Sequence, residues 1–207
     1  MKTILVTGGS GFIGRNLCMR LASTVEERSD YQLIVLSRNP EKAAKVLPQS
    51  VQTISDLTQL NQPIEILINL AGEPIADRRW SDKRKATISQ SRIQTTQKLY
   101  EYFKQADKSP SIVISGSAIG YYGGGVANHQ PVTEEGAVEP NFSSQLCADW
   151  ESAAQQFEQL GARVCLLRTG IVLGQQGALS KLLPAFKLGL GGPIASGQQW
   201  MPWVHVE

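Results

Sequence analysis

The sequence predicts an α/β protein built on a doubly wound parallel sheet, and three patterns in the chain indicate it. Short apolar runs alternate with longer stretches of helical periodicity, as successive βαβ units require. Two of the runs, SIVIS (111–115) and EILINL (65–70), are nearly continuous and rich in β-branched residues, which is typical of parallel strands buried on both faces. A glycine-rich turn, TGGSGFIG, directly follows the first run.

Each expected element follows from its own local pattern. The apolar runs predict six strands, at Thr3–Thr7, Gln32–Leu36, Val51–Ile54, Ile64–Asn69, Ser111–Ser115 and Arg163–Arg168. A helix over Phe12–Ala22 would place Ile13, Leu17, Cys18 and Leu21 on its inward face. A capping residue followed by proline, Asn39-Pro40, begins a second helix, and further helices are expected over residues 81–105 and 145–160.

Composition excludes several classes of function. The chain has 207 residues, 42% of them apolar, so it can bury one full core or one domain plus part of another. A net charge of +2, with no basic and aromatic residues interleaved, argues against nucleic acid and membrane partners. The cysteines are three and far apart, which favours free thiols in a reducing cytoplasm, and the two histidines have no companion ligands for a metal.

The glycine turn predicts a dinucleotide site. Gly9-x-Gly11-x-x-Gly14 lies between a strand and a helix, where glycines let the backbone approach a pyrophosphate, as in a Rossmann domain. The helix start then offers free N–H groups to the phosphates. The alternative is a tight turn with no ligand.

The end of the second strand indicates which dinucleotide is bound. It reads Leu36-Ser37-Arg38-Asn39 and lacks the acid that usually binds the ribose 2′-hydroxyl of NAD. Arg38 can pair with a 2′-phosphate, and Ser37 can donate a hydrogen bond to it. We therefore expect NADP as the cofactor, with a solvated surface arginine as the alternative reading of Arg38.

The motifs together resemble a known family. TGGSGFIG, NLAG (69–72) and SGSAIGYYG (115–123) look like an extended short-chain dehydrogenase/reductase. More narrowly, NLAGEPIADRRW, SRIQTTQKL, RTGIVLG and LGLGGPIASGQQWMPWVHVE resemble the atypical YfcH-type NAD(P)-dependent epimerases, which are usually labelled nucleoside-diphosphate-sugar epimerases. The resemblance implies a nucleotide-sugar substrate and allows a homodimer. It also implies an NADP-binding domain over residues 1–173 and, over 174–207, the start of a substrate-binding portion that continues in a longer chain.

The resemblance also assigns cofactor contacts. The turn would hold the pyrophosphate, the end of the second strand the 2′-phosphate, and the segments after the third and fourth strands the adenine and the ribose. The residues implied are Gly8, Gly11, Phe12, Ile13, Ser37, Arg38, Leu57, Leu70, Ala71, Gly72, Arg92 and Val172. For Arg92, on the long helix, a surface salt bridge is the alternative.

The family's catalytic pattern is only partly present. Ser117 and Tyr121 match its Ser-x-x-x-Tyr after the fifth strand, so we expect them to be catalytic, although Tyr121 and Tyr122 can equally serve packing. The Tyr-x-x-x-Lys pair is missing, because residues 141–147 read NFSSQLC and place Cys147 where the lysine belongs. A lone helical cysteine is more often a buried apolar residue than an acid or base.

Three functions therefore compete. The first is an NADP-dependent oxidoreductase or epimerase whose substitute groups come from Ser117, Tyr121, Tyr122 and Glu73. The second is an NADP-binding sensor or scaffold without catalysis. The third, an ordinary sugar-nucleotide epimerase, conflicts with the missing tyrosine and lysine.

Overall fold

The computed structural model describes most of the chain. The described residues are 2–28, 30–106, 108–123, 131–136, 140–193 and 196–207. They form two compact units, Met1–Arg168 and Thr169–Glu207. Each unit is described by itself.

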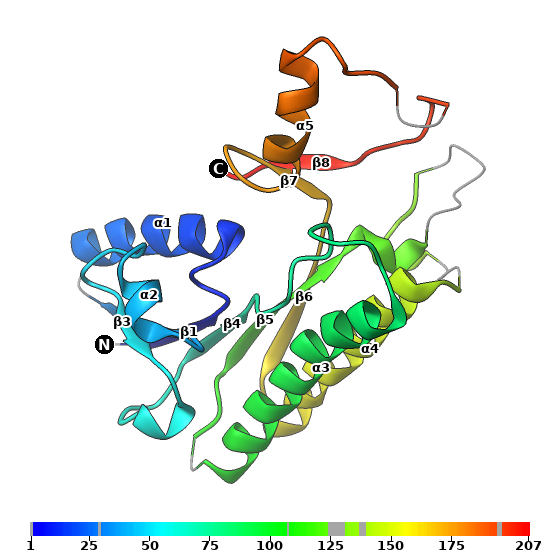
Figure 1. Cartoon of the computed structure of the whole chain (residues 1–207). Helices are drawn as coiled ribbons and strands as arrows, with labels where there is room; N and C mark the ends of the chain where they lie inside the picture. Colours follow the sequence, from blue (N-terminus) through cyan, green and yellow to red (C-terminus); the bar gives the residue numbers. More distant parts are fainter. Residues whose placement is uncertain (1, 29, 107, 124–130, 137–139, 194–195) are drawn as a thin grey trace. The chain divides into compact units, whose positions relative to one another are not determined.

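A six-stranded sheet organises the first unit (Figure 1). Its strands are β1 (Lys2–Thr7), β2 (Tyr31–Leu36), β3 (Gln52–Ile54), β4 (Ile66–Asn69), β5 (Ile112–Ala118) and β6 (Arg163–Thr169), in the order β3-β2-β1-β4-β5-β6. Thr7 is level with Leu36 of β2 and with Asn69 of β4, and Asn69 is level with Ser115 of β5. The carboxyl ends of four parallel strands therefore meet at one edge of the sheet.

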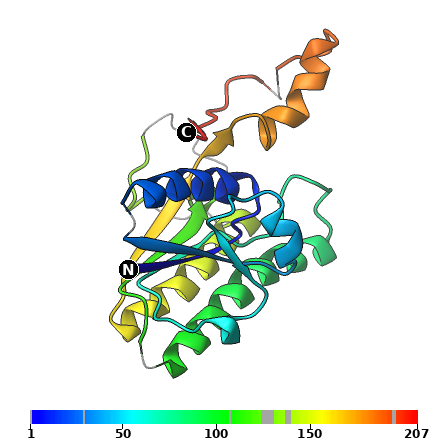
Figure 2. The ribbon, with the colours of Figure 1, turned by 90° about the vertical axis from the view of Figure 1, so that its left-hand side faces the viewer.

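Helices cover both faces of this sheet (Figures 1 and 2). They are α1 (Phe12–Arg28), α2 (Pro40–Ala44), α3 (Asp82–Gln105) and α4 (Phe142–Gln155), with short 3₁₀ turns η1 (Leu57–Gln59), η2 (Ile119–Tyr122) and η3 (Gln156–Leu160). Leu5 and Leu67 lie in a core with Leu99 and Phe103 of α3, whereas Val6 lies in a second core with Cys18 of α1. Alternate strand residues thus face opposite helical layers, which confirms the predicted doubly wound α/β fold.

The helix boundaries follow from their caps. The Asn39 side chain accepts a hydrogen bond from Lys42 N at 3.0 Å, and Pro40 occupies the first helical position of α2. Ser81 caps α3 by accepting from Arg84 N at 3.2 Å. Asn141 forms a capping box with Ser144 at the start of α4. Such caps satisfy backbone N–H groups that have no partner within the helix.

The prediction that Ile13 faces the core is wrong. Its side chain is 42% exposed. A Cβ on the next residue, Gly14, would lie 2.3 Å from Gly8 O, so α1 is held against the turn by Gly14. Because Gly14 occupies the packed side of the first helical turn, Ile13 is rotated toward solvent.

The second unit is small. Its elements are β7 (Ile171–Leu173), α5 (Ala178–Lys187) and β8 (Trp203–His205), and β7 pairs with β8 in parallel. Large apolar side chains lie exposed along it, namely Phe186, Leu188, Leu190, Trp200 and Trp203. Within the described residues of both units, no helix is long and apolar enough to cross a membrane.

Candidate functional site

The glycine turn lies at the carboxyl edge of the sheet, between β1 and α1. Gly8 has a φ of +71°, and a Cβ there would lie 2.5 Å from Leu70 O, so only glycine fits between the turn and the loop after β4. Gly11 N donates to Gly8 O at 3.0 Å. Gly11 is exposed and Phe12 half-buried. The first turn of α1 therefore begins beside an open glycine surface, where a phosphate can approach.

Ser37 and Arg38 follow β2 at the same edge. Ser37 N donates to Ile54 O of β3 at 2.9 Å, and its hydroxyl donates to Asn39 O at 3.2 Å. The Arg38 side chain is 93% exposed and pairs with Glu73 Oε1 at 3.1 Å. An acidic side chain from the loop after β4 thus lies beside Arg38. Nearby in the chain, Leu57 is half-buried and packs against the core.

A polar chain fixes the loop after β4. The Thr7 hydroxyl donates to Asn69 Oδ1 at 2.6 Å, and Asn69 Nδ2 donates to Thr96 Oγ1 at 2.8 Å. Ala71 N in turn donates to Thr7 Oγ1 at 3.3 Å. Because Thr7 and Asn69 are buried, these bonds hold Leu70–Gly72 in place beside the glycine turn.

Arg92 of α3 holds this loop through hydrogen bonds and close packing. Its Nη2 donates to Glu73 O at 3.0 Å, its Nη1 donates to Ile88 O at 3.1 Å, and a Cβ on Gly72 would lie 2.8 Å from its Cζ. The guanidinium also lies over the Trp150 ring, 5.2 Å from the centroid. Burial lowers the pKa of Arg92. An exposed salt bridge is therefore not the role of this residue, and its contact with a cofactor stays a prediction.

Ser117 is held in a buried charged network. Its hydroxyl donates to Glu151 Oε1 at 2.5 Å, and Glu151 is 4% exposed. Arg168 binds Glu151 through two bonds, Nε to Oε1 and Nη2 to Oε2, each 2.8 Å long. Hydrogen bonding to Glu151 raises the pKa of Arg168. This bidentate pair gives the buried Glu151 side chain a hydrogen-bond partner on each of its oxygens.

Both tyrosines of η2 contact the same arginine. Arg168 Nη1 donates to Tyr122 Oη at 2.9 Å and to Glu134 O at 2.6 Å. Its Cζ lies 3.5 Å from the centroid of the Tyr121 ring. The structure thus brings Ser117, Tyr121 and Tyr122 together around a residue pair, Glu151 and Arg168, that sequence reasoning missed.

The start of α4 shows what stands where the family's tyrosine and lysine are expected. A Cβ on Gly120 would lie 3.3 Å from Ser143 Cβ and 3.7 Å from Cys147 Sγ, so both residues face η2. Burial raises the pKa of the Cys147 thiol. Phe142 packs edge-on against Trp80, with centroids 5.2 Å apart. Burial favours the neutral form of the Cys147 thiol, which cannot replace the lysine cation.

Glu151 and Arg168 gave only weak signals in the sequence. Arg168 follows two leucines on β6, whereas Glu151 lies between Trp150 and Ser152 on α4. Charged residues are rarely fully buried without a partner, so a buried Glu151 would require a cation nearby, but nothing in the sequence identifies Arg168 as that cation. Val172 belongs to the second unit, so its proposed cofactor contact stays a prediction.

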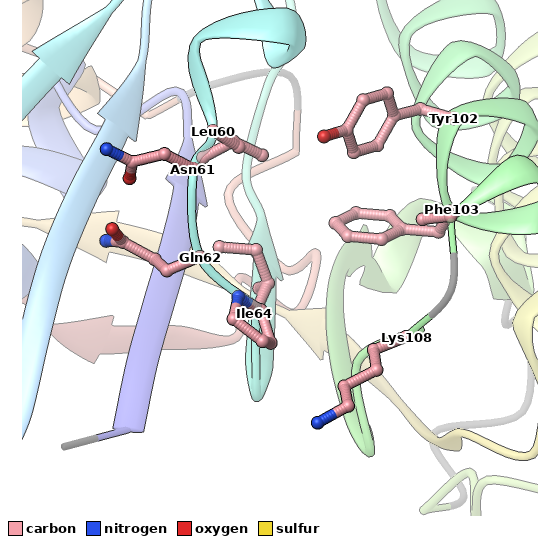
Figure 3. Close-up of a pocket in the computed structure, with 9 residues that line it drawn as sticks. Leu60, Asn61, Gln62, Ile64, Tyr102, Phe103 and Lys108 are labelled. Atoms are coloured by element: carbon pink, nitrogen blue, oxygen red, sulfur yellow. The ribbon is translucent and has the colours of Figure 1, made fainter.

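A separate groove lies at the opposite edge of the sheet (Figure 3). Its volume is about 400 Å³, and its lining includes Leu60, Gln62 and Ile64 ahead of β4 and Tyr102 and Phe103 at the end of α3. The lining residues lie just before the amino-terminal end of β4 or at the end of α3, which precedes β5. The groove is therefore distinct from the site at the carboxyl edge. In the described part of the chain, no cluster of side chains is suited to hold a metal ion.

Comparison with known proteins decides the family. The model of the NAD dependent epimerase/dehydratase family matches residues 4–207. The chain belongs to this family. An epimerase family protein of Staphylococcus aureus strain N315 is 36% identical over 211 residues, which cover 100% of this chain and 68% of that protein. A chloroplastic homologue of the epimerase family protein SDR39U1 from Arabidopsis thaliana is 34% identical over 99% of this chain and 59% of its own length.

Solved structures of epimerase family members share the fold. Human SDR39U1, determined with NADPH, is 30% identical with a TM-score of 0.79, and the match covers 99% of this chain and 66% of the human chain. A nucleoside-diphosphate sugar epimerase from Corynebacterium glutamicum is 28% identical with a TM-score of 0.77, over 99% of this chain and 41% of that one. UDP-glucuronic acid 4-epimerase from Bacillus cereus, at 20% identity and a TM-score of 0.75, supports the fold alone, over 99% and 69% of the two chains.

Proposed function

We propose that this epimerase family member binds NADP and acts as an epimerase- or dehydratase-like oxidoreductase without the Tyr-x-x-x-Lys pair. The observation that carries the proposal is the meeting of three segments at one sheet edge: the glycine turn, Ser37-Arg38 and Leu70–Gly72. The human relative solved with NADPH supports the choice of cofactor. The Bacillus relative solved with UDP-glucuronic acid and NAD supports the fold that such a cofactor requires.

The residues present fit a dinucleotide. Gly11 is exposed beside the first turn of α1, and a side chain there would fill the space that a pyrophosphate needs. Arg15, in that first turn, has a buried Nε without a hydrogen-bond partner among the described residues. Arg38 offers an exposed cation for a 2′-phosphate. When bound, the nicotinamide supplies hydride transfer.

The hydrogen bond to Glu151 determines what Ser117 can do. The Ser117 hydroxyl donates its proton to Glu151 Oε1, which also accepts from Arg168 Nε. While this bond is intact, Ser117 cannot donate the same proton to a substrate carbonyl, so we assign Ser117 a role in orienting the substrate. Tyr121, with Arg168 over its ring, is the neighbouring candidate for proton transfer.

A non-catalytic NADP sensor or scaffold is the second candidate. Phe142, Ser143 and the buried thiol of Cys147 stand near the place of the family's tyrosine and lysine. None of the three lowers the pKa of a tyrosine hydroxyl as a lysine cation does. Tight NADP binding without turnover of any substrate would favour this candidate.

Three further assignments belong to the same proposal. The family relationship supports a nucleotide-sugar substrate, because one relative is named a nucleoside-diphosphate sugar epimerase. Homodimerisation is proposed because related folds commonly form dimers through a pair of long exposed helices. A cytoplasmic location is proposed from the three free cysteines, Cys18, Cys147 and Cys165, although one relative is chloroplastic.

Cofactor binding is the first test. Calorimetric titration should give tighter binding of NADPH than of NADH, and Arg38→Ala should weaken NADPH binding by about 1–2 kcal/mol with little effect on NADH. Arg163→Ala is the matched control. Arg163 is an exposed arginine at the start of β6, at the amino-terminal end of the strand and therefore away from the carboxyl edge where the site lies. Equal affinity for both dinucleotides, unchanged in Arg38→Ala, would contradict the proposal.

Turnover is the second test. A panel of nucleotide-sugars and simple alcohols is screened with NADP⁺ by absorbance and by product analysis. We expect slow turnover that Ser117→Ala and Tyr121→Phe reduce. Robust epimerisation that survives both substitutions would overturn the assigned roles, and no turnover at all would favour the sensor.

A further inference from the structure

Around the loop after β4, two arginines share a single acidic side chain. Glu73 has one carboxylate and two arginine partners, Arg38 at 3.1 Å and Arg84 at 3.5 Å. The Arg38 side chain is 93% exposed, whereas that of Arg84 is 15% exposed and that of Glu73 24%. One partner is therefore easily removed from Glu73, and the other is held beside it.

The backbone of Glu73 is fixed independently of its carboxylate. Its N–H donates to Ser91 Oγ at 2.9 Å, and its carbonyl accepts from Arg92 Nη2 at 3.0 Å. Arg84 Nη2 also donates to the carbonyl of Pro74. Loss of the bond to Arg38 would thus leave the loop in place and free only the Glu73 side chain.

Arg84 has unused capacity to bind. Its Nε is buried and has no hydrogen-bond partner within the described residues. The contact from its Nη1 to Glu73 Oε2, at 3.5 Å, is longer than a good charge-assisted hydrogen bond, which is nearer 2.8 Å. A small rotation of Glu73 toward Arg84 would shorten this contact and let Arg84 hold the carboxylate that Arg38 releases.

We propose that Glu73 is an exchangeable counter-ion that moves from Arg38 to Arg84 when a 2′-phosphate binds Arg38. Glu73 and Arg84 then set the preference for NADP over NAD without touching the cofactor. Glu73 competes with the 2′-phosphate for Arg38, and its negative charge repels the phosphate. When Arg84 binds the Glu73 carboxylate, both the competition and the repulsion are reduced. This inference rests on the proposed cofactor site and adds two specificity-determining positions to it.

Two single variants of the full-length protein test the exchange by titration with NADPH and NADH. Glu73→Gln removes the competitor and should tighten NADPH binding about two- to fivefold, the range of an exposed ion pair. Arg84→Gln leaves Glu73 on Arg38 and should weaken NADPH binding by a similar factor. NADH, which lacks the phosphate, should change by less than about twofold in both. Glu101→Gln and Arg79→Gln, exposed residues with the same charge changes, serve as controls.

The double variant Glu73→Gln/Arg84→Gln separates an indirect role of Arg84 from a direct one. If Arg84 acts only by holding Glu73, its substitution has no effect once Glu73 is neutral, and the two changes are strongly non-additive. A loss of NADPH affinity that persists in the double variant would mean that Arg84 binds the phosphate itself, and would overturn the exchange.

The remaining outcomes are also distinguishable. NADPH binding that is indifferent to Glu73→Gln overturns this inference and leaves the proposed cofactor site intact. A wild-type protein that binds neither dinucleotide overturns both. Far-ultraviolet circular dichroism of each variant checks that the fold is retained.

Discussion

Single side chains in this protein take their chemistry from burial more than from their neighbours in the sequence. Cys18 is fully buried between α1 and β2, and this burial raises the pKa of its thiol to about 11. Its neutral form is therefore favoured in the native state. The same effect makes the thiol unreactive, because only the thiolate is a good nucleophile.

This predicts a loss of stability in alkali that depends on Cys18. The ordinary pKa of the thiol is 9.0, so stability is unaffected below pH 9 and falls as the pH rises through about 11, where the unfolded chain releases the proton more readily. Urea unfolding of wild type and Cys18→Ala between pH 7 and 11 measures it. Between pH 7 and pH 11 the wild type should lose on the order of 2 kcal/mol more unfolding free energy than Cys18→Ala. Parallel profiles would refute the prediction.

Residue-level predictions from sequence succeeded where one local pattern decides the position. Asn39, which the Asn39-Pro40 pattern predicts as a capping residue, caps α2. Ile13 failed because periodicity alone does not show that Gly14 is the residue packed against the turn. Glu151 and Arg168 were missed because their pairing joins α4 to β6, and no local pattern records a contact between distant segments.

At the scale of elements, the glycine turn combines two different requirements. A Cβ on Gly14 would lie 2.3 Å from Gly8 O and 2.7 Å from Gly9 Cα, so it would collide with the backbone. A Cβ on Gly11 would meet only Gly8 O, at 3.2 Å, and otherwise face open space. Gly14 therefore serves the fold, and Gly11 leaves room for a ligand.

Matched alanine substitutions should separate these requirements. Gly14→Ala should destabilise the protein by about 1–3 kcal/mol, because α1 must move away from the turn. Gly11→Ala should cost less stability than Gly14→Ala, because its one close contact, at 3.2 Å, needs only a small shift. It should weaken NADPH binding, since the methyl group would occupy the approach of the pyrophosphate. The reverse pattern, with Gly11→Ala unstable and still binding normally, would contradict this assignment.

At the scale of the whole molecule, the first unit holds all the described parts of the candidate site except Val172. Both cores, the Ser117–Glu151–Arg168 network and all of the sheet except the last residue of β6 lie within Met1–Arg168. A chain that ends after Gly170 keeps β6 complete. It should unfold cooperatively, and NADPH at about 100 times its dissociation constant should stabilise it by about 2.7 kcal/mol. Thermal unfolding with and without NADPH tests this, and a chain without a cooperative transition would refute it.

The succession of strands and helices along the chain and the doubly wound fold class were predictable, because apolar runs and periodicity are repeated along the whole chain. All six predicted strands are present, with ends that differ by a few residues. The position of Glu73 was not predictable, because its loop approaches Arg38 only after β4 pairs beside β1. Sequence patterns thus specify the scaffold well and specify poorly those contacts that the scaffold creates.

The series of hydrogen bonds that joins β1, β4 and α3 runs from donor to acceptor in a fixed direction. That direction restricts which mutations are tolerated. Thr7 gives its proton to Asn69 Oδ1, while Asn69 Nδ2 gives one to Thr96, whose own proton goes to Arg92 O. Aspartate differs from asparagine by one atom and arises by a single base change or by deamidation with age. At position 69 it would place an acceptor oxygen opposite Thr96 Oγ1. The Thr96 hydroxyl could then bond to residue 69 only by donating its own proton and giving up its bond to Arg92 O. One of the smallest chemical changes available to the protein would therefore disturb the junction between its central strands and the loop beside the glycine turn.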